Sequence, residues 1–479
     1  MGRYGMGSAD AAWLHMDRPT NLMVVNGVLW FDEALDWERL RTVVQERLVD
    51  PFPRFRQRVA EPRLGLGTPS WEDYDSFDVD LHLHRVALPA PADRTQLEAL
   101  VADRMVVALD RSRALWEMHL IEGYRGGCAV HVRVHHAIAD GIALARVLLS
   151  MTDDEDAAGT THPTPIAPST DVERRGGLAP VLRPARAAVG AAGAAIGAAR
   201  SLAGGTWSEG RSLLAEPSRA IDLAAGARAG ARALAKVLVP LPDTDTVLRG
   251  ELGVAQRVTW TEPLSLADVK ELAHASGATV NDVLLAGLTG ALRRYLLARD
   301  SLVDEIHVLV PFNLRPLDEP LPRDLGNHFG LVRLVLPVGI TGRAERLAAV
   351  HREMDAIKHS PEGVMAYAVL EAMGVTPVQV ESALVDLFSG SGSAVVTNVP
   401  GPRRRVLLAG TPVRGVLVWA PVAGGMGISV SIISYAGEVT VGLMTDAALV
   451  PDPQRIARGF AAEMRALRTT VGGSRRRDR

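Results

Sequence analysis

The stretch His135-His136-Ala-Ile-Ala-Asp140-Gly141 holds the residues best suited to acid–base chemistry. A neutral imidazole, with an unperturbed pKa of about 6.5, can take a proton at neutral pH. The alternating run 128–134 before the histidines predicts a strand, and the run 142–150 after them has helical spacing. The pair therefore lies at a strand-to-helix turn. Because successive strand side chains point to opposite faces, only one histidine can face a given cavity.

Three interpretations of this stretch can be compared. In the first, the histidines only satisfy hydrogen bonds at a turn, and Asp140 caps the helix. In the second, they bind zinc or iron; His131, His82 and His84 are available as further ligands, but none forms a recognised ligand pair. In the third, one histidine is a general base for a hydroxyl nucleophile, and Asp140 holds the turn through a pair with an arginine. We favour the third interpretation and expect no metal.

The composition limits the classes of protein to which the chain can belong. The 479 residues fit two domains, and a hydrophobic fraction of 47% is that of a globular chain. A formal net charge of −3 provides no overall field that would attract nucleic acid. Cys128 is the single cysteine, so an intramolecular disulfide is excluded. Because neither a signal peptide nor a transmembrane stretch is evident, we expect a cytoplasmic protein, either soluble or peripheral on the inner membrane face or on lipid inclusions.

Helix and strand signals are mixed along the chain, which indicates an α/β fold of mixed α+β layers. We expect an N-terminal domain over 1–151, a linker and Ala/Gly/Arg-rich crossover over 152–250, a C-terminal domain over 251–470, and a disordered basic tail over 471–479. Expected strands cover 26–31, 115–123, 128–134, 305–311, 331–337, 393–398, 413–419, 427–434 and 438–444. Expected helices cover 36–48, 94–109, 142–150, 264–276, 279–298, 342–358, 363–373 and 453–467.

The segment 178–236, inside the crossover, is dominated by alanine, glycine and arginine. Alanine favours a helix and glycine weakens it. Two interpretations remain open: a loosely helical connection between domains, or a helix whose arginines meet anionic lipid headgroups.

The histidine stretch resembles the HHxxxDG motif of the CoA-dependent acyltransferase superfamily. An isolated HHxxxDG would also fit peptide-synthetase condensation domains. Other segments are similar, in order, to signatures of the bacterial wax ester synthase/diacylglycerol acyltransferase family, although Ala114 and Tyr124 replace a proline and a leucine of that pattern. These segments are Leu115-Trp116-Glu117 with Leu120-Ile-Glu-Gly123, Asn281-Asp282, 311–316, Gly326-Asn327 and 398–402. The resemblance covers roughly residues 8–470.

This resemblance implies two chloramphenicol-acetyltransferase-like domains with the active site in a tunnel between them. It also implies transfer of a long-chain acyl group from acyl-CoA to diacylglycerol, giving triacylglycerol, or to a fatty alcohol, giving a wax ester. Acyl-CoA is then a co-substrate, and no cofactor is expected. The alternatives are an acyltransferase acting on another hydroxyl, of a polyketide or glycolipid, and a non-catalytic lipid-binding protein of the same fold.

The resemblance also implies residue roles. His136 matches the catalytic base, and His135, Asp140 and Gly141 complete the motif. Asn281 and Asp282 would shape the tunnel, although they could also simply cap a helix. Arg315 is the preferred partner of Asp140.

Other positions have simpler interpretations. The oxyanion donor is not assigned by the sequence; Thr397, Asn398 and Ser429 are candidates. Cys128, on a strand without an activating neighbour, is expected to be a buried inert thiol, and Trp116 a core residue. The stretch 424–427 lacks the lysine and hydroxyl of a phosphate-binding loop and predicts a turn.

Overall fold

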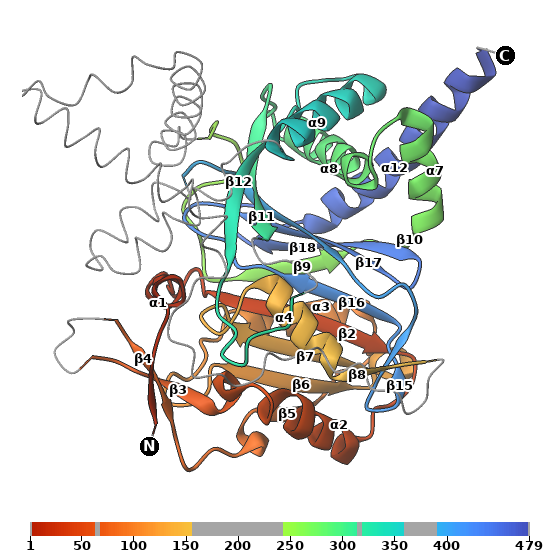
Figure 1. Cartoon of the computed structure of the whole chain (residues 1–479). Coiled ribbons are helices and arrows are strands. Elements are labelled where there is room, and N and C mark those ends of the chain that lie inside the picture. Colours follow the sequence, from red (N-terminus) through yellow and green to blue (C-terminus); the bar gives the residue numbers. More distant parts are fainter. Residues whose placement is uncertain (1, 63–67, 156–242, 314–318, 359–389, 478–479) are drawn as a thin grey trace, which may run out of the picture.

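The computed structural model describes residues 2–62, 68–155, 243–313, 319–358 and 390–477. Two large sheets face each other, and four helices cover the outer face of the second sheet (Figure 1). The expected helix 363–373, the segment 178–236 and Arg315 lie outside the described residues. Among the described helices, none has the length and hydrophobicity that a membrane span requires.

The first sheet has five strands and the second has seven. The first sheet runs in the order β16 (Gly415–Trp419), β2 (Val24–Phe31), β7 (Cys128–His135), β6 (Trp116–Glu122) and β5 (Leu83–Ala87). The second sheet runs in the order β10 (Leu264–Ser265), β18 (Glu438–Asp446), β17 (Ile428–Tyr435), β13 (Ala394–Pro400), β11 (Ile306–Asn313) and β12 (Phe329–Leu336), with β9 (Gln256–Trp260) paired to β18.

Two small sheets and the helices complete the described architecture. The small sheets are β1 (Arg3–Gly5), β4 (Ser70–Asp73) and β3 (Gln57–Ala60), and β15 (Thr411–Pro412), β14 (Val406–Leu408) and β8 (Thr152–Asp154). The α-helices are α1 (Ser8–His15), α2 (Trp37–Val44), α3 (Arg94–Met105), α4 (Gly141–Ser150), α7 (Leu266–Ser276), α8 (Val280–Leu297), α9 (Arg343–Lys358) and α12 (Pro453–Arg477).

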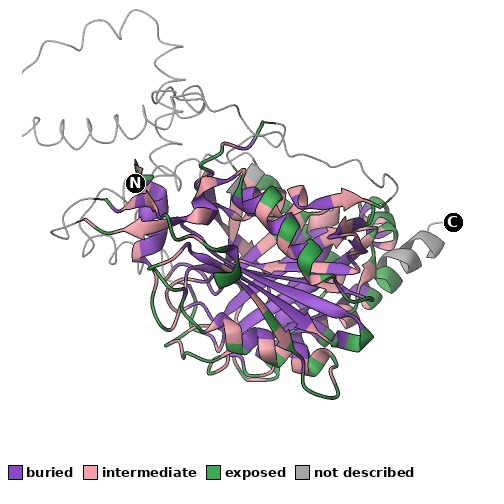
Figure 2. Ribbon diagram, turned by 90° about the horizontal axis from the view of Figure 1, so that it is seen from below, coloured by how far each residue is buried: buried purple, intermediate pink, exposed green. Residues whose placement is uncertain are grey.

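β7, which leads to the histidine turn, lies in the middle of the first sheet and is buried at every residue. Figure 2 shows that strands in the interior of the molecule are largely buried. The expected hairpin is confirmed, because β6 pairs antiparallel with β7 from Trp116 to Glu122. The turn between these strands requires glycine: a Cβ at Gly127 would lie 2.2 Å from the carbonyl oxygen of Phe31. A side chain there would force β2 away from β7.

The second sheet is apolar on both faces, which explains its position between helices and the first sheet. Along β17, Ile428, Val430 and Ile432 pack against the helix layer, whereas Ile433 belongs to the core shared with the first sheet. In β18, Met444 likewise turns toward that shared core. Because side chains alternate along a strand, the second sheet contributes side chains to two hydrophobic cores, one on each of its faces.

One strand of the C-terminal half belongs to the first sheet. The sequence placed 413–419 in the C-terminal domain, but β16 pairs antiparallel with β2, from Gly415 opposite Trp30 to Trp419 opposite Asn26. The exchange is possible because the backbone of Gly415 passes directly beneath the Trp30 indole, where a Cβ would lie 2.1 Å from the ring. The two halves of the chain are therefore joined by a continuous ladder of hydrogen bonds.

Several expected helix ends were wrong; for example, α3 ends at Met105 where we expected a helix to 109. The helix expected over 36–48 is α-helical only to Val44 and continues as a π-helix over Gln45–Val49, closed by the bond from Asp50 N to Gln45 O. The helix α12 continues to Arg477, so 471–477 are helical where we expected a disordered tail.

Gly415→Val should lower the free energy of unfolding by about 1–3 kcal/mol, because the new side chain must displace the Trp30 ring or lift β16 off β2. Chemical denaturation measures the change. The matched control is Gly5→Val on β1, where a Cβ meets nothing within 4 Å. Equal stability of the two variants would contradict the close approach of β16 and β2.

Candidate active site

The two histidines lie at the end of β7, immediately before α4. His135 is the last residue of the strand, and Asp140 is the N-cap of α4, with its Oδ1 accepting a hydrogen bond from Ala143 N at 2.8 Å. An aspartate at this position satisfies a backbone donor that the helix itself leaves unpaired. The strand-to-helix turn predicted from the sequence is confirmed.

The hydrogen bonds of Asn327 define the protonation of His136. The carboxamide Nδ2 of Asn327 donates to His136 O at 2.7 Å and to Asp10 Oδ1 at 2.8 Å. Both partners are acceptors, so the amide orientation is fixed, and Asn327 Oδ1 faces His136 Nδ1 at 2.9 Å. The imidazole must then carry its proton on Nδ1. This leaves the Nε2 lone pair free, and no described residue donates a hydrogen bond to it.

His136 is buried between aromatic rings from both halves of the chain. Its ring stacks on Trp13 of α1 with the centroids 4.2 Å apart, and Phe329 of β12 lies at 5.4 Å. Burial lowers the pKa of His136 to about 4, although the charge of Asp140 and the hydrogen bond to Asn327 act in the opposite direction. The imidazole is therefore neutral at pH 7, as a proton acceptor must be.

His135 has the opposite tautomer. Its Nδ1 accepts a hydrogen bond from Ala137 N at 3.0 Å, so its proton is on Nε2, which lies 3.6 Å from Asp17 Oδ2. The side chain is 1% exposed. His135 is therefore committed to the turn and to Asp17, and its position agrees with a supporting role.

Asp140 connects the turn to the second half of the molecule, but not through a described arginine. Its Oδ2 accepts a hydrogen bond from His328 N at 3.0 Å, and Gly326 N donates to Ile138 O at 3.2 Å. With the bond from Ala143 N, Asp140 thus accepts hydrogen bonds from two backbone N–H groups, one from each half of the chain. We had expected an ion pair with Arg315, which lies outside the described residues.

Gly141, the last residue of the motif, begins α4 and has no close neighbour among the described residues. A Cβ on Gly141 would meet no described atom within 4 Å. The space beside the first residue of α4 is therefore open with respect to the described residues, and glycine is not required there by packing against them.

Asn281 and Asp282, which we expected to shape a tunnel, have different surroundings. Asp282 is fully buried: its Oδ2 accepts hydrogen bonds from Thr279 N at 2.8 Å and from His351 Nδ1 at 2.7 Å. It closes a capping box at the start of α8 and faces α9, so its contacts are structural. Asn281 instead accepts a hydrogen bond from Asn398 Nδ2 at 2.7 Å, which brings two distant motifs together.

The candidate oxyanion donors already have partners within the protein. Ser429 Oγ donates to Ala420 O at 2.8 Å, and Thr397 Oγ1 donates to Val430 O at 3.3 Å. Asn398 is exposed and retains a second amide proton beyond its bond to Asn281. Of the three candidates, Asn398 is therefore the one that keeps a donor without a partner among the described residues.

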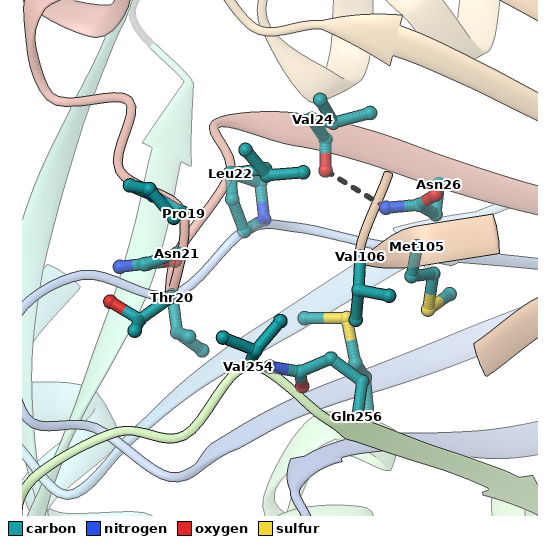
Figure 3. A pocket seen from close by; sticks show the side chains of 13 residues that line it. Pro19, Thr20, Asn21, Leu22, Val24, Asn26, Met105, Val106, Val254 and Gln256 are labelled. Carbon is teal, nitrogen blue, oxygen red and sulfur yellow. Dashed lines mark hydrogen bonds between the residues drawn. The ribbon is translucent and has the colours of Figure 1, made fainter. Parts of the chain in front are cut away.

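A small crevice lies beside the histidine turn, between the two halves (Figure 3). Val24, which is opposite His135 in the sheet, lines it together with Leu22, and the intervening Met23 O accepts a hydrogen bond from His136 N at 2.8 Å. The other walls come from both halves: Pro19, Thr20, Asn21, Asn26, Met105, Val106, Val254, Gln256, Pro421, Val422 and Met444. Its volume of about 30 Å³ is too small for an acyl chain.

The expectations for residues outside the site are confirmed for Cys128, Trp116 and the glycine-rich turn. Cys128 is buried, and burial raises the pKa of its thiol to about 11, so it is not a nucleophile at neutral pH. Trp116 is fully buried and donates from Nε1 to Phe55 O at 2.8 Å. Gly427 N donates to Leu248 O at 2.9 Å, so 424–427 is a packed turn.

One group away from His136 has the composition of a metal site. His84, Glu117 and His119 on β5 and β6 place one potential ligand atom each within 4.8 Å of one another. Glu117, however, accepts a hydrogen bond from Arg133 Nη1 at 2.9 Å, and Arg133 is fully buried. A dication would take the carboxylate away from a buried guanidinium, which is costly, so we assign no metal here.

The structure adds residues to the site that the sequence did not point to. Asp10 and Trp13 from α1 reach His136, although nothing in their local pattern indicates it. Asn327 was noted only as part of a Gly-Asn pair; that pair, lying next to an expected strand, was the one available signal.

The fold, with a buried neutral histidine between two sheets, is that of the condensation and acyltransferase class. The first condensation domain of the calcium-dependent antibiotic synthetase superposes with a TM-score of 0.56 at 16% identity, covering 98% of this chain and 96% of that one. The wax ester synthase/diacylglycerol acyltransferase from Marinobacter aquaeolei VT8 gives a TM-score of 0.66 at 21% identity, covering 98% and 100%. These likenesses establish the fold.

Sequence comparison narrows the class to one family. The model of the wax ester synthase/diacylglycerol acyltransferase catalytic domain matches residues 6–284, and that of the C-terminal domain of the same family matches 325–468. A putative diacylglycerol O-acyltransferase of Mycobacterium bovis and a probable one of Mycobacterium tuberculosis are each 30% identical over 464 residues, 94% of this chain and 93% of theirs. The chain belongs to the wax ester synthase/diacylglycerol acyltransferase family.

Asp140→Ala should destabilise the protein by about 1–2 kcal/mol through loss of the helix cap, and should also lower turnover because His328 N loses its acceptor. Asp140→Asn is the matched control, since its side-chain oxygen can still cap α4. Denaturation curves and initial rates separate the two effects. A fully active Asp140→Ala enzyme would contradict a role of this contact in holding the site.

Proposed function

We propose that the protein is an O-acyltransferase that transfers a long-chain acyl group from acyl-CoA to diacylglycerol, forming triacylglycerol, and to fatty alcohols, forming wax esters. Members of its family act on acyl-CoA and on acylglycerol or alcohol acceptors. The observation that carries the proposal for this chain is the neutral, Nδ1-protonated His136 with a free Nε2. It supports a general base at the interface of the two halves.

In the proposed reaction, Nε2 of His136 removes the proton of the acceptor hydroxyl as that oxygen attacks the thioester carbonyl carbon. A C–O bond forms and the carbonyl becomes an oxyanion. When the tetrahedral intermediate collapses, the C–S bond breaks and the CoA thiolate takes the proton from His136. Direct attack needs both substrates side by side, a base and an oxyanion donor, so the proposal includes no acyl-enzyme and no cofactor.

The other motif residues support His136 in this proposal. His135 and Asp140 hold the turn through Asp17 and His328, and the open space beside Gly141 leaves room for a substrate to approach the start of α4. Asn398, anchored by Asn281, is our preferred oxyanion donor among the described candidates because it keeps a free amide proton.

We also propose that the enzyme works at a lipid surface. Its acceptors are water-insoluble, and the described helices offer no membrane span. Peripheral contact at the inner membrane face or on lipid inclusions therefore fits the substrates, and the arginine-rich segment 178–236, outside the described residues, has the composition for such contact.

The proposal is tested by thiol release from palmitoyl-CoA with diacylglycerol or hexadecanol as acceptor. We expect acceptor-dependent release by the wild type and a fall of about 10²–10⁴-fold in His136→Ala, the contribution typical of a general base. His274→Ala, at an exposed position on α7, is the matched control and should keep full activity. Circular dichroism verifies that both variants fold.

Each negative outcome has a defined meaning. Unchanged turnover in His136→Ala would end the general-base assignment. Release stimulated only by a polyketide or glycolipid hydroxyl would change the acceptor, and no acceptor-stimulated release with any alcohol would favour a lipid-binding protein of the same fold.

A further inference from the structure

Two side chains of helix α1 are linked to His136, the proposed base. Asp10 and Trp13 are one helical turn apart and so lie on the same side of α1. Trp13 stacks on the His136 ring, and Asp10 reaches it through Asn327. Asp10 is also in the first turn of α1, where the helix dipole favours a negative charge. None of the family signatures found in the sequence includes this helix.

Asp10, Asn327 and His136 form a continuous chain of hydrogen bonds. Asp10 Oδ1 accepts from both the backbone N and the side-chain Nδ2 of Asn327, at 2.9 and 2.8 Å. Asn327 Oδ1 in turn accepts from His136 Nδ1 at 2.9 Å. The amide NH₂ has two acceptors, Asp10 Oδ1 and His136 O, so without Asp10 only His136 O would oppose its rotation. A rotated amide would turn its NH₂ toward His136 and favour the other tautomer, in which Nε2 carries the proton.

Few positively charged groups compensate the negative charge of the Asp10 carboxylate. Burial raises its pKa to about 6, opposed by the two hydrogen bonds from Asn327 and by the charge of Arg54, while Asp140 acts in the same direction as burial. Arg54 is shared with Gln57, to which it donates at 2.6 Å, and with Asp324 at 4.0 Å. The imidazolium that would form on His136 during the reaction is separated from the Asp10 carboxylate by a single hydrogen-bonded amide.

We propose that Asp10 is a positioning residue for the base: through Asn327 it holds His136 in the tautomer with a free Nε2, and its negative charge stabilises the imidazolium formed during acyl transfer. This inference rests on the proposed function. In this proposal, the Asp10 carboxylate, the Asn327 amide and the His136 imidazole act together. The carboxylate and the imidazole come from the first half of the chain and the amide from the second. Acid–base groups are oriented in this way when a carboxylate acts on a catalytic histidine directly; here an amide lies between them.

The decisive variant is Asp10→Asn, which keeps an oxygen that can accept from Asn327 but removes the charge. We expect kcat to fall by about 10- to 100-fold with the KM for acyl-CoA unchanged. In the wild type, kcat/KM should fall as the pH drops below about 6, because Asp10 takes up a proton and its charge is lost. In Asp10→Asn this limb should disappear, leaving only the loss near pH 4 that belongs to His136.

The control variant is Asp243→Asn. Asp243 is also buried and accepts hydrogen bonds from His307 Nδ1, at 2.8 Å, and from Ser393 Oγ. His307 is opposite Val335, about 20 Å along β12 from Phe329, so this variant loses a buried charge without touching the site. It should lose stability but keep wild-type kcat and the pH limb.

A second measurement does not depend on activity. In protein labelled with ¹⁵N-histidine, with the resonance of His136 assigned from its loss in His136→Ala, the nitrogen shifts should report Nδ1 protonated in the wild type. Asp10→Leu should give a mixture of tautomers.

If no substrate is acylated but this tautomer change is observed, the proposed function fails while the positioning role of Asp10 stands. Wild-type kcat in Asp10→Asn, a pH limb that persists in that variant, or an unchanged tautomer in Asp10→Leu would each overturn the inference.

Discussion

One carboxamide, that of Asn327, joins the two halves of the molecule at the base. It accepts from the His136 ring, and it donates to the His136 backbone and to Asp10. A buried polar network is strongly favoured only when every member is satisfied, since the low dielectric makes an unpaired group costly. The halves therefore have one relative position that satisfies the amide. The bond from His328 N to Asp140 next to it adds to the same constraint.

Burial at this junction disfavours the charged forms of His136 and Asp10. It lowers the pKa of His136 to about 4 and raises that of Asp10 to about 6. For His136 the consequence is a weaker base that is nevertheless always neutral and available at pH 7. The loss in basicity can be recovered only by groups that favour the imidazolium, which gives Asp10 and Asp140 their importance.

The fold holds this junction in place because strands from both halves of the chain contribute to the same sheet and to the same hydrophobic core. β16, from the C-terminal half, completes the first sheet beside β2, and the inner face of the second sheet packs into the same core as β7. Separating the halves would break a hydrogen-bonded ladder and expose apolar surface at once. His136 directly follows β7 and Asn327 lies two residues before β12, so strands anchor the site, and strands hold side chains more rigidly than free loops do.

The sequence by itself determined the local features: the strand–turn–helix around His136, the capping role of Asp140, the hairpin of β6 and β7, and most helices of the second half. These follow from periodicity, caps and turns, which are encoded within a few residues. Only the tertiary structure decided which nitrogen of His136 is free, that Asp282 serves a helix cap, and that β16 crosses to the first sheet. Asn327 lies 191 residues from His136 and 317 from Asp10, and partners brought together by long-range packing leave no periodic signal in the chain.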